Sequence, residues 1–306
     1  MTYHRTVLAK ECLKFLSVIP GKWYLDGTLG DGGHSLLIAA KGGYVWGNDQ
    51  DDEALNRAKA RLEDHTKDSV QVSHDPHGPV EPTARLILTR GNFEDMANIW
   101  QQLHLPPLNG ILLDLGASTL QLMSISRGFS FVSNAPLDMR MDRRLGVTAA
   151  DLLNALSARE LGQMFAELGG ERMSKKIAEA IVAKRKTTPF RTTQQLADLV
   201  SKLKSRVGRL HPATKVFQAL RMAVNSEHHA LTKALPAALQ ILAPKGRLAI
   251  IAFHEGEDRI VKRFFKQNAR INKLTILTPK PVTPTGKERN QNPRSRSAKL
   301  RVAAKI

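Results

Sequence analysis

A glycine-rich turn between two apolar runs constrains the fold of this chain more than any other feature. The apolar residues 23–25 lead into the segment DGTLGDGGHS, residues 26–35, and the apolar run LLIAA follows it. This order predicts a strand, a ligand-binding loop and a helix in succession. Glycine is needed where a backbone approaches a ligand, because a Cβ would block the contact. The turn therefore predicts a cofactor site, although a glycine-rich turn without a ligand is the alternative.

An acidic residue follows the turn at a characteristic distance. The next apolar run, residues 44–48, ends at Asp49. In nucleotide-binding α/β folds, an acid at the end of the second strand, about 20 residues past the glycine loop, hydrogen-bonds ribose hydroxyls. The spacing therefore favours a cofactor that contains a nucleoside.

The charges around the turn distinguish between cofactors. A dinucleotide fingerprint places pyrophosphate on the helix N-terminus and supplies a third glycine, whereas this chain has Ser35 after Gly30 and Gly32. Asp26 and Asp31 flank the turn, and two carboxylates would repel pyrophosphate but attract the ammonium and sulfonium groups of S-adenosylmethionine. We therefore expect S-adenosylmethionine, and a nicotinamide-dependent dehydrogenase is the disfavoured alternative.

The composition narrows the range of possible partners and binding sites. The net charge of +18 favours a polyanionic partner, and nucleic acid is the natural candidate; a merely solvated basic surface is hard to reconcile with this excess. The single cysteine, Cys12, excludes an internal disulfide. His65, His74 and His77 match no metal-binding spacing, so no metal is expected. Without a signal-peptide pattern or a membrane-spanning apolar run, we expect a cytoplasmic protein with no membrane partner.

The rest of the chain continues the α/β pattern and then interrupts it. Residues 56–62 predict a helix, 65–83 an exposed loop, and 86–88 and 110–115 two further strands, the last ending at Asp114. Since ligands bind outside the carboxyl ends of parallel strands, Asp26, Asp49 and Asp114 should converge on one crevice. Phe93, just after the third predicted strand, either walls in an adenine ring or belongs to the core.

A helical region separates two α/β parts. Residues 148–207 contain only helical patterns, with capping boxes at Thr148–Asp151 and Thr192–Gln195. A long helix over 212–235 and a strand over 247–254 then resume the α/β pattern. We therefore expect an α/β sheet with an inserted all-α domain, divided as 1–135 and 211–306 for the sheet domain with its basic tail, and 136–210 for a helical substrate-binding domain.

Several longer motifs carry a specific resemblance. In chain order they are GTLGDGGHS, GILLDLGAST, RGFSF, PLDMRMD, HPATKVFQALRMAVN, EDRIVKRFF and NPRSRSAKLRV. Together they resemble the bacterial MraW/RsmH family, whose members are Rossmann-like S-adenosylmethionine-dependent methyltransferases acting on the N4 amine of a cytosine in the decoding centre of small-subunit (16S) ribosomal RNA. The resemblance implies that substrate, presented by the assembled 30S particle. With the glycine turn, it assigns cofactor binding to Gly30, Gly32, Gly33, His34, Asp49, Phe93, Asp114 and Gln121.

One motif departs from that family. Where its members usually read FHSLEDR, this chain reads FHEGEDR, so Glu255 and Gly256 stand at the serine and leucine positions. The local site is therefore expected to differ. A non-catalytic ribosomal RNA-binding or assembly protein that kept the cofactor fold is the resulting alternative.

The expected reaction defines which catalytic groups to look for. A cytosine amine is a weak nucleophile because its lone pair is delocalised, so an enzyme must align it and accept a proton. The candidates are Asp138 or Asp142 in PLDMRMD, followed by His254. The alternatives are salt bridges from the carboxylates to neighbouring arginines, and a hydrogen-bonded histidine at a strand end.

The RNA contacts are expected from basic, aromatic and motif residues. Arginine binds phosphate in bidentate fashion, and aromatic rings stack on extruded bases. Core packing is the alternative for at least one of the two phenylalanines, and a final core strand over 298–302 is the alternative to a basic RNA clamp over 287–305. The residues assigned to substrate RNA are Arg127, Phe129, Phe131, Arg140, His211, Arg221, Asn225, Arg259, Arg294 and Arg296.

Overall fold

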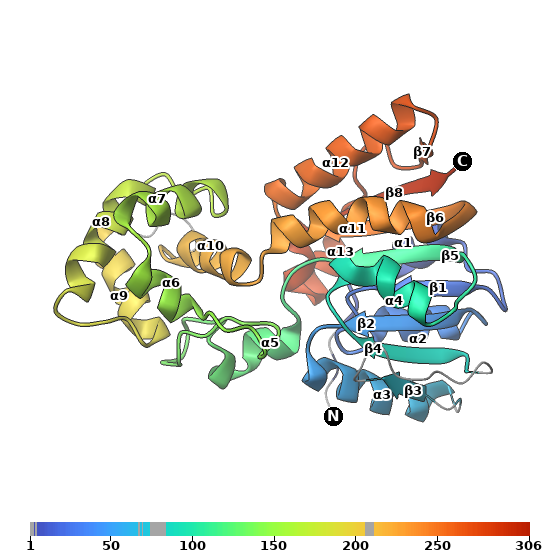
Figure 1. Ribbon diagram of the computed structural model, residues 1–306, viewed down its shortest axis with the longest axis horizontal. Coiled ribbons are helices and arrows are strands. Elements are labelled where there is room, and N and C mark those ends of the chain that lie inside the picture. The colour runs from blue at the N-terminus through green and yellow to red at the C-terminus, as the bar shows by residue number, and fades with distance from the viewer. Residues whose placement is uncertain (1–2, 4, 67, 69, 74–83, 206–210) are drawn as a thin grey trace. The chain divides into compact units, whose positions relative to one another are not determined.

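The chain folds into two compact units, shown in the computed structural model of Figure 1. The structure describes residues 3, 5–66, 68, 70–73, 84–205 and 211–306. One unit comprises residues 1–116 and 228–306, and the other comprises residues 117–227. These divisions differ from the boundaries at 135/136 and 210/211 that the sequence suggested.

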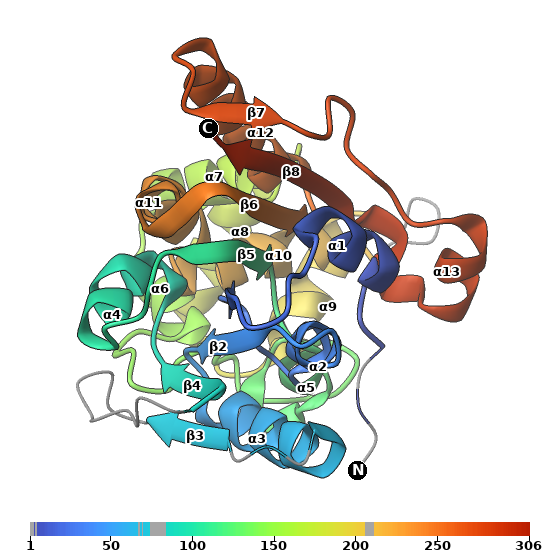
Figure 2. The same cartoon turned by 90° about the vertical axis from the view of Figure 1, so that its right-hand side faces the viewer.

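The first unit is built on one eight-stranded sheet in the order β3-β4-β2-β1-β5-β6-β8-β7. Figure 2 shows this order, with β3 at one edge and β7 at the other. The strands from β3 to β6 pair in parallel, whereas β8 runs antiparallel to β6 and β7. The strands are β1 (Trp23–Asp26), β2 (Tyr44–Asp49), β3 (Val70–Ser73), β4 (Leu86–Arg90), β5 (Leu108–Asp114), β6 (Leu242–Ala252), β7 (Leu274–Ile276) and β8 (Lys299–Lys305).

Helices cover both faces of this sheet because successive strand residues point to opposite sides. Tyr24 and Val45 join a core with α1 (Ala9–Leu16), α2 (Gly33–Ala39) and α3 (Asp52–Thr66). Leu25 and Trp46 face the other core, with α4 (Met96–Gln102), α11 (Glu227–Ile241) and α12 (Glu255–Arg270). The unit also contains α13 (Gly286–Gln291) and the short 3₁₀ helices η1 (Phe93–Asp95) and η3 (Pro293–Ser297). This doubly covered parallel sheet confirms the predicted α/β class.

In the described residues of the second unit, 117–205 and 211–227, the regular secondary structure is helical, apart from one isolated bridge between Pro136 and Thr192. Both predicted capping boxes are present, at Thr148–Asp151 and Thr192–Gln195. In each box the N-cap hydroxyl accepts a hydrogen bond from the N3 amide, and the N3 side-chain oxygen accepts one from the N-cap amide. The helices are α5 (Thr119–Met123), η2 (Ile125–Arg127), α6 (Ala149–Ala155), α7 (Ala158–Glu167), α8 (Ser174–Arg185), α9 (Thr193–Leu203) and α10 (Thr214–Val224). Residues 128–147, between η2 and α6, form a long loop.

The predicted helix over 212–235 is wrong, because two helices occupy this region. α10 ends at Val224 and α11 begins at Glu227, with Ser226 in the left-handed region at φ 49°. Asn225 ends α10, and its side chain bonds the main chain of Met139 and Met141. The apolar period continues through the break, so the sequence pattern does not reveal it.

Three smaller predictions also need correction. The expected loop over 65–83 contains the end of α3 and the strand β3, while residues 74–83, with His74 and His77, lie outside the described residues. β6 ends at Ala252, and His254 caps α12 instead of ending a strand. The tail ends in β8, so the core-strand alternative is confirmed for this part of it. Among the helices of the described residues, none has the length and apolar character to cross a membrane.

Candidate cofactor and substrate sites

The glycine turn connects β1 to α2, and its glycines serve two different physical needs. Gly30 and Gly32 have φ of 51° and 71°, a backbone conformation that side chains disfavour. At Gly33, a Cβ would collide with the hydroxyl of Thr6. Gly30 and Gly32 are therefore required by the conformation of the turn, and Gly33 by a close contact with the N-terminal segment.

Two carboxylates meet where β1 and β5 end. Asp26 is only 1% exposed, and its Oδ2 accepts a hydrogen bond from Ser35 Oγ at 2.7 Å. Asp114 follows at the end of the adjacent strand, where its amide nitrogen donates to Thr28 Oγ1 at 2.6 Å. Among the described residues, nothing hydrogen-bonds to Asp26 Oδ1 or Asp114 Oδ1, although both atoms are buried. These two buried oxygens can therefore accept hydrogen bonds from a ligand.

The electrostatics of this pair favour a cationic ligand. Burial raises the pKa of Asp26 to about 6, against the opposing effect of hydrogen bonds from Ser35 and Thr28. Burial also raises the pKa of Asp114 well above its ordinary value, and the negative charges of Asp26 and Glu257 raise it further. A positive group between these carboxylates would relieve both the desolvation and the repulsion.

His34 lies beside Asp114 as a neutral imidazole. Its Nε2 is 3.8 Å from Asp114 Oδ2. Burial lowers the pKa of His34 to about 3, so the ring carries no charge near neutral pH. The contact is therefore not an ion pair, and the negative charge of Asp114 is not neutralised by it.

Asp49 shapes the turn through two hydrogen bonds to main-chain amides. Its Oδ2 accepts from Gly30 N at 2.9 Å and its Oδ1 from Asp51 N at 3.0 Å. Burial raises the pKa of Asp49 to about 7, although these two hydrogen bonds oppose the shift. A carboxylate has about four lone-pair sites, so two remain for a ligand.

Asp31, whose position beside the turn suggested that it attracts the cofactor, is instead paired with an arginine. Arg57 Nε donates to Asp31 Oδ1 at 2.9 Å and Arg57 Nη2 to Oδ2 at 3.2 Å. This bidentate pair neutralises the Asp31 carboxylate, so Asp26 and Asp114 are the carboxylates beside the turn that can attract a cation.

The remaining two cofactor candidates differ in their surroundings. Phe93 begins η1 and packs, partly buried, against the core that contains Leu25, which supports the core alternative for part of its ring. Gln121 belongs to the other compact unit and is 4% exposed. Its side-chain oxygen accepts from Ser118 N at 3.0 Å as part of the capping box of α5.

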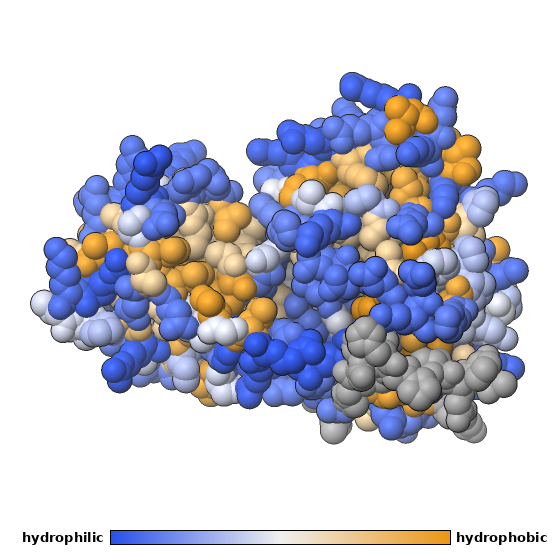
Figure 3. All heavy atoms as spheres, in the orientation of Figure 1, coloured by the Kyte–Doolittle hydropathy of each residue, from blue (hydrophilic) through white to orange (hydrophobic). Residues whose placement is uncertain are grey.

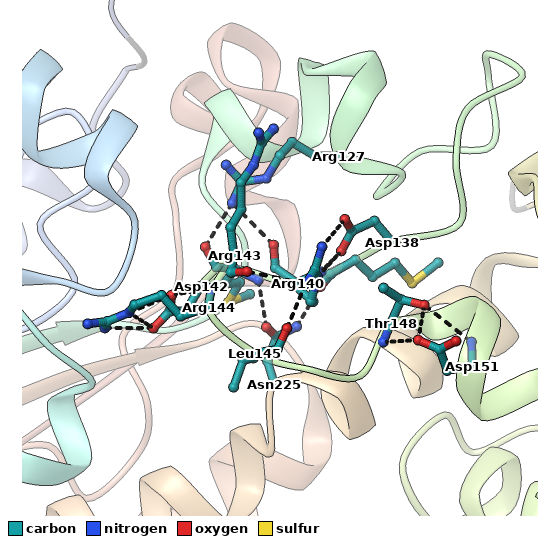
Figure 4. A network of polar contacts seen from close by, with 12 residues as sticks. Arg127, Asp138, Arg140, Asp142, Arg143, Arg144, Leu145, Thr148, Asp151 and Asn225 are labelled. Carbon is teal, nitrogen blue, oxygen red and sulfur yellow. Dashed lines mark hydrogen bonds and ion pairs between the residues drawn. The ribbon is translucent and has the colours of Figure 1, made fainter.

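Both acidic catalytic candidates are paired with arginines in the PLDMRMD loop, as Figure 4 shows. Asp138 accepts from Arg140 Nε at 2.7 Å and from Arg140 Nη2 at 2.9 Å. Burial raises the pKa of Asp138, but the hydrogen bonds and charge of Arg140 outweigh it and lower the pKa overall. Asp142 Oδ2 accepts from Arg144 Nη2 at 2.7 Å. The salt-bridge alternative for these two residues is therefore supported.

The side chain of His254 caps the N-terminus of α12. Its Nδ1 accepts the Glu257 amide hydrogen at 3.4 Å, and its Nε2 lies 2.9 Å from Glu257 Oε1. Accepting through Nδ1 places the proton of the neutral ring on Nε2. This arrangement supports the alternative of a hydrogen-bonded histidine over that of a catalytic base.

The sequence interpretation missed His228, which packs against His254 with ring centroids 5.6 Å apart. A Cβ at Gly256 would lie 2.7 Å from His228 Nε2. Gly256, already noted as a departure from the family pattern, was the available signal. Its missing side chain provides the space that the His228 imidazole occupies.

Three of the predicted RNA contacts are core residues. Arg127 is 2% exposed, and its Nη2 donates to the carbonyls of Arg140 at 3.2 Å and Met141 at 2.8 Å. Asn225, 6% exposed, accepts from Met141 N at 2.7 Å (Figure 4). Phe129 lies in the core of the helical unit. These residues fix the PLDMRMD loop from within, so the phosphate and base contacts assigned to Arg127 and Phe129 are corrected to structural roles.

The other RNA candidates form an aromatic cluster, an ion pair or a set of exposed arginines. Phe131 stacks on His211 at 4.5 Å and meets Phe217 edge-on at 5.0 Å. Arg221 forms two hydrogen bonds of 2.8 Å with Glu227, so its charge is paired. Arg259, Arg294 and Arg296 are exposed.

No group of histidine, cysteine, aspartate or glutamate side chains within the described part of the chain has a metal-binding arrangement.

Comparison with known proteins places this geometry in a family. The model of the MraW methylase family matches residues 1–306. A protein named Ribosomal RNA small subunit methyltransferase H from Thermomicrobium roseum is 43% identical, over 100% of this chain and 94% of its own length. One of the same name from Trichlorobacter lovleyi is 44% identical, over 99% and 98%. A solved structure titled as a putative rRNA-methylase from Clostridium thermocellum is similar over 100% of both chains, at a TM-score of 0.48 and 12% identity. Membership of a methylase family bears out S-adenosylmethionine as the predicted cofactor. The chain belongs to the MraW methylase family.

Proposed function

We propose that this protein transfers a methyl group from S-adenosylmethionine to the N4 amine of a cytosine in the decoding centre of 16S ribosomal RNA, within the assembled 30S particle. The observation that carries the cofactor part is the pair of buried, unpartnered oxygens on Asp26 and Asp114. The resemblance of the motifs and the names of the relatives support the RNA part.

The residues at the carboxyl ends of β1, β2 and β5 fit the cofactor. Asp26 and Asp114 would accept the ammonium group and lie near the positive sulfonium, and the two remaining lone-pair positions of Asp49 would accept ribose hydroxyls. The exposed part of Phe93 would lie against the adenine. When bound, S-adenosylmethionine supplies an electrophilic methyl group.

The protein's own residues have to orient the amine and accept its proton. The carboxylate of Asp138, with its lowered pKa, is a weak base. It remains a good hydrogen-bond acceptor, and we assign it the orientation of the amino N–H. Methyl transfer makes the amine nitrogen cationic and acidic, so the Asp138 carboxylate, although a weak base, can accept the proton that this nitrogen loses. Asp142 is the second candidate for the same role.

The RNA would be bound by both compact units. We propose the 117–227 unit as the substrate domain, with the Phe131–His211 stack as the platform for an extruded base. Figure 3 shows apolar side chains between hydrophilic ones over the visible face of this unit, and Met123, Ile125 and Val132 are among its exposed apolar residues. Arg259, Arg294 and Arg296 would contact phosphates.

A labelling experiment tests the whole assignment. Incubating the protein with labelled S-adenosylmethionine and unmodified 30S particles, followed by nucleoside mapping, should yield N4-methylcytidine. Naked ribosomal RNA serves as the comparison and should react more slowly. A 5-methylcytidine product would contradict the proposal, since that reaction needs a cysteine nucleophile and Cys12 is buried in α1.

Two other outcomes identify the rival functions. Normal cofactor and RNA binding without turnover would indicate a non-catalytic assembly protein. Binding of a nicotinamide cofactor in place of S-adenosylmethionine would indicate a dehydrogenase.

A further inference from the structure

Residues 5–8 of the N-terminal segment lie between the glycine turn and the C-terminal NPRSRS segment. On one side, the hydroxyl of Thr6 fills the space over Gly33. On the other side, Asn292 Nδ2 donates to Arg5 O at 3.1 Å, and Leu8 N donates to Glu288 Oε1 at 2.8 Å. The C-terminal segment therefore reaches the cofactor turn through the first residues of the chain.

Tyr3 makes a second connection from the same segment to the turn. Its ring centre lies 5.5 Å from Arg57 Cζ and 4.7 Å from Arg61 Cζ. Arg57 binds the side chain of Asp31, and Arg61 Nη1 donates to Asp31 O at 3.2 Å. The turn residue Asp31 is thus held, in both side chain and main chain, by arginines that pack on Tyr3.

The C-terminal end of this connection is firmly built. Asn292 is 4% exposed, and its carbonyl accepts from Ser295 Oγ at 2.8 Å, while Ser295 is fully buried. Leu8 is also buried and has a left-handed backbone, with φ of 50°. Leucine adopts that conformation only where surrounding contacts hold it, and the bond from its N–H to Glu288 is one of them.

We propose that Glu288 and Asn292 are positioning residues for the cofactor: they fix residues 5–8, which in turn fix Gly33 and the glycine turn. The proposal rests on the proposed function in taking S-adenosylmethionine as the ligand of that turn. It assigns the beginning of the NPRSRS motif to cofactor binding, and leaves RNA contact to the exposed arginines that follow.

The physical reason is preorganisation. A turn that is already held in its binding conformation loses less conformational freedom when the ligand arrives, so affinity rises without any new contact to the ligand. Releasing residues 5–8 should therefore weaken cofactor binding even though neither Glu288 nor Asn292 lies on the turn.

Matched substitutions in the full-length protein test this. Glu288→Ala and Asn292→Ala each remove one hydrogen bond and should raise the Kd of S-adenosylmethionine about fivefold by calorimetry. Glu288→Gln keeps a side-chain oxygen for Leu8 N and should retain nearly normal affinity. With 30S particles as substrate, KM for S-adenosylmethionine should rise in the alanine variants, while kcat and KM for the particle stay unchanged.

Hydrogen exchange supplies a readout of the turn itself. Amides of residues 29–36 should exchange faster in Glu288→Ala than in Glu288→Gln. Where an alanine variant fails to fold, Tyr3→Ala compared with Tyr3→Phe tests whether the N-terminal segment positions the turn, since phenylalanine keeps a ring face for the two arginines. We expect weaker cofactor binding in Tyr3→Ala only.

The outcomes separate the two levels of the argument. Wild-type protein that does not bind S-adenosylmethionine would overturn the proposed function. Wild-type binding with unchanged affinity and exchange in folded Glu288→Ala and Asn292→Ala would overturn the positioning role alone.

Discussion

Asp26 and Asp114 end the adjacent parallel strands β1 and β5, and the charge of Asp26 is, after burial, the next cause of the raised pKa of Asp114. The sheet thus concentrates negative charge at the carboxyl end of its central strands, where a cation can be bound.

Cofactor affinity should depend on pH through these carboxylates. The anionic form of Asp26 binds the cation, and the anionic form of Asp49 is the better acceptor for ribose hydroxyls; the pKa values of Asp26 and Asp49 are about 6 and about 7. Affinity should therefore rise from about pH 5 to pH 8, by up to about tenfold per unit for each proton released.

Stability of the free protein should change in the opposite direction. An acid whose folded pKa is raised binds more protons when folded, so the free energy of unfolding falls as pH rises from about 4 through these values.

Calorimetry at several pH values, in buffers of different ionisation enthalpy, measures both affinity and proton release. Asp26→Asn should weaken binding and flatten its pH dependence. Asp198→Asn, which changes an exposed carboxyl on α9, is the matched control and should leave the profile unchanged. A wild-type affinity independent of pH would contradict the carboxylate assignment.

Asp49→Ala should weaken cofactor binding and spare RNA binding. The substitution removes the acceptor for Gly30 N as well as the predicted ribose contact. Each hydrogen bond to a charged group contributes roughly 1.5–3 kcal/mol, so a loss of about tenfold to a hundredfold is expected. Asp49→Asn keeps one acceptor oxygen, so its cofactor affinity should lie between those of the wild-type protein and Asp49→Ala. Titration calorimetry and filter binding of ribosomal RNA give the comparison, and an unchanged cofactor affinity would refute the role of Asp49.

Features fixed by neighbouring residues were predicted well from the sequence. Asp26, Asp49 and Asp114 do end parallel strands, because alternating apolar runs and their polar ends are local patterns. The caps at Thr148 and Thr192 also depend only on residues three positions away. Such features need no knowledge of the tertiary structure.

Features fixed by distant partners were not predicted. The break at Ser226 depends on Asn225 binding main-chain groups of Met139 and Met141, more than eighty positions earlier in the chain. The neutralisation of Asp31 requires Arg57 from α3. Arg127 has a residue type that is usually exposed, yet its several N–H donors satisfy buried carbonyls. Residue type alone cannot reveal such pairings.

Arg294→Ala combined with Arg296→Ala should reduce the salt dependence of RNA binding. Both side chains are exposed in η3, where they can reach phosphates. Losing two phosphate contacts should lower the slope of log affinity against log salt by about 1.5.

The double substitution Lys266→Ala with Lys273→Ala removes the same charge from exposed positions elsewhere. It should leave the slope nearly unchanged. Filter binding over a range of salt concentrations measures both variants, and equal slopes in the two would show that the effect belongs to net charge and not to η3.

Gly256→Leu should destabilise the protein by an amount that depends on His228. A Cβ at position 256 would lie 2.7 Å from His228 Nε2 and 2.9 Å from its Cε1, closer than real Cβ contacts. Overpacking of this kind costs roughly 1–3 kcal/mol. Leucine is a better helix former than glycine by up to about 1 kcal/mol, so the clash should outweigh the gain in helix propensity.

Removing the imidazole should reverse the sign of that effect. In a His228→Ala background the same Gly256→Leu change has room for its side chain, so the loss of stability should disappear and the two changes should be strongly non-additive. Urea denaturation of the four proteins in this cycle gives the coupling free energy. Additive effects would show that the glycine at position 256 has no connection to His228, and that the departure from the family pattern needs another explanation.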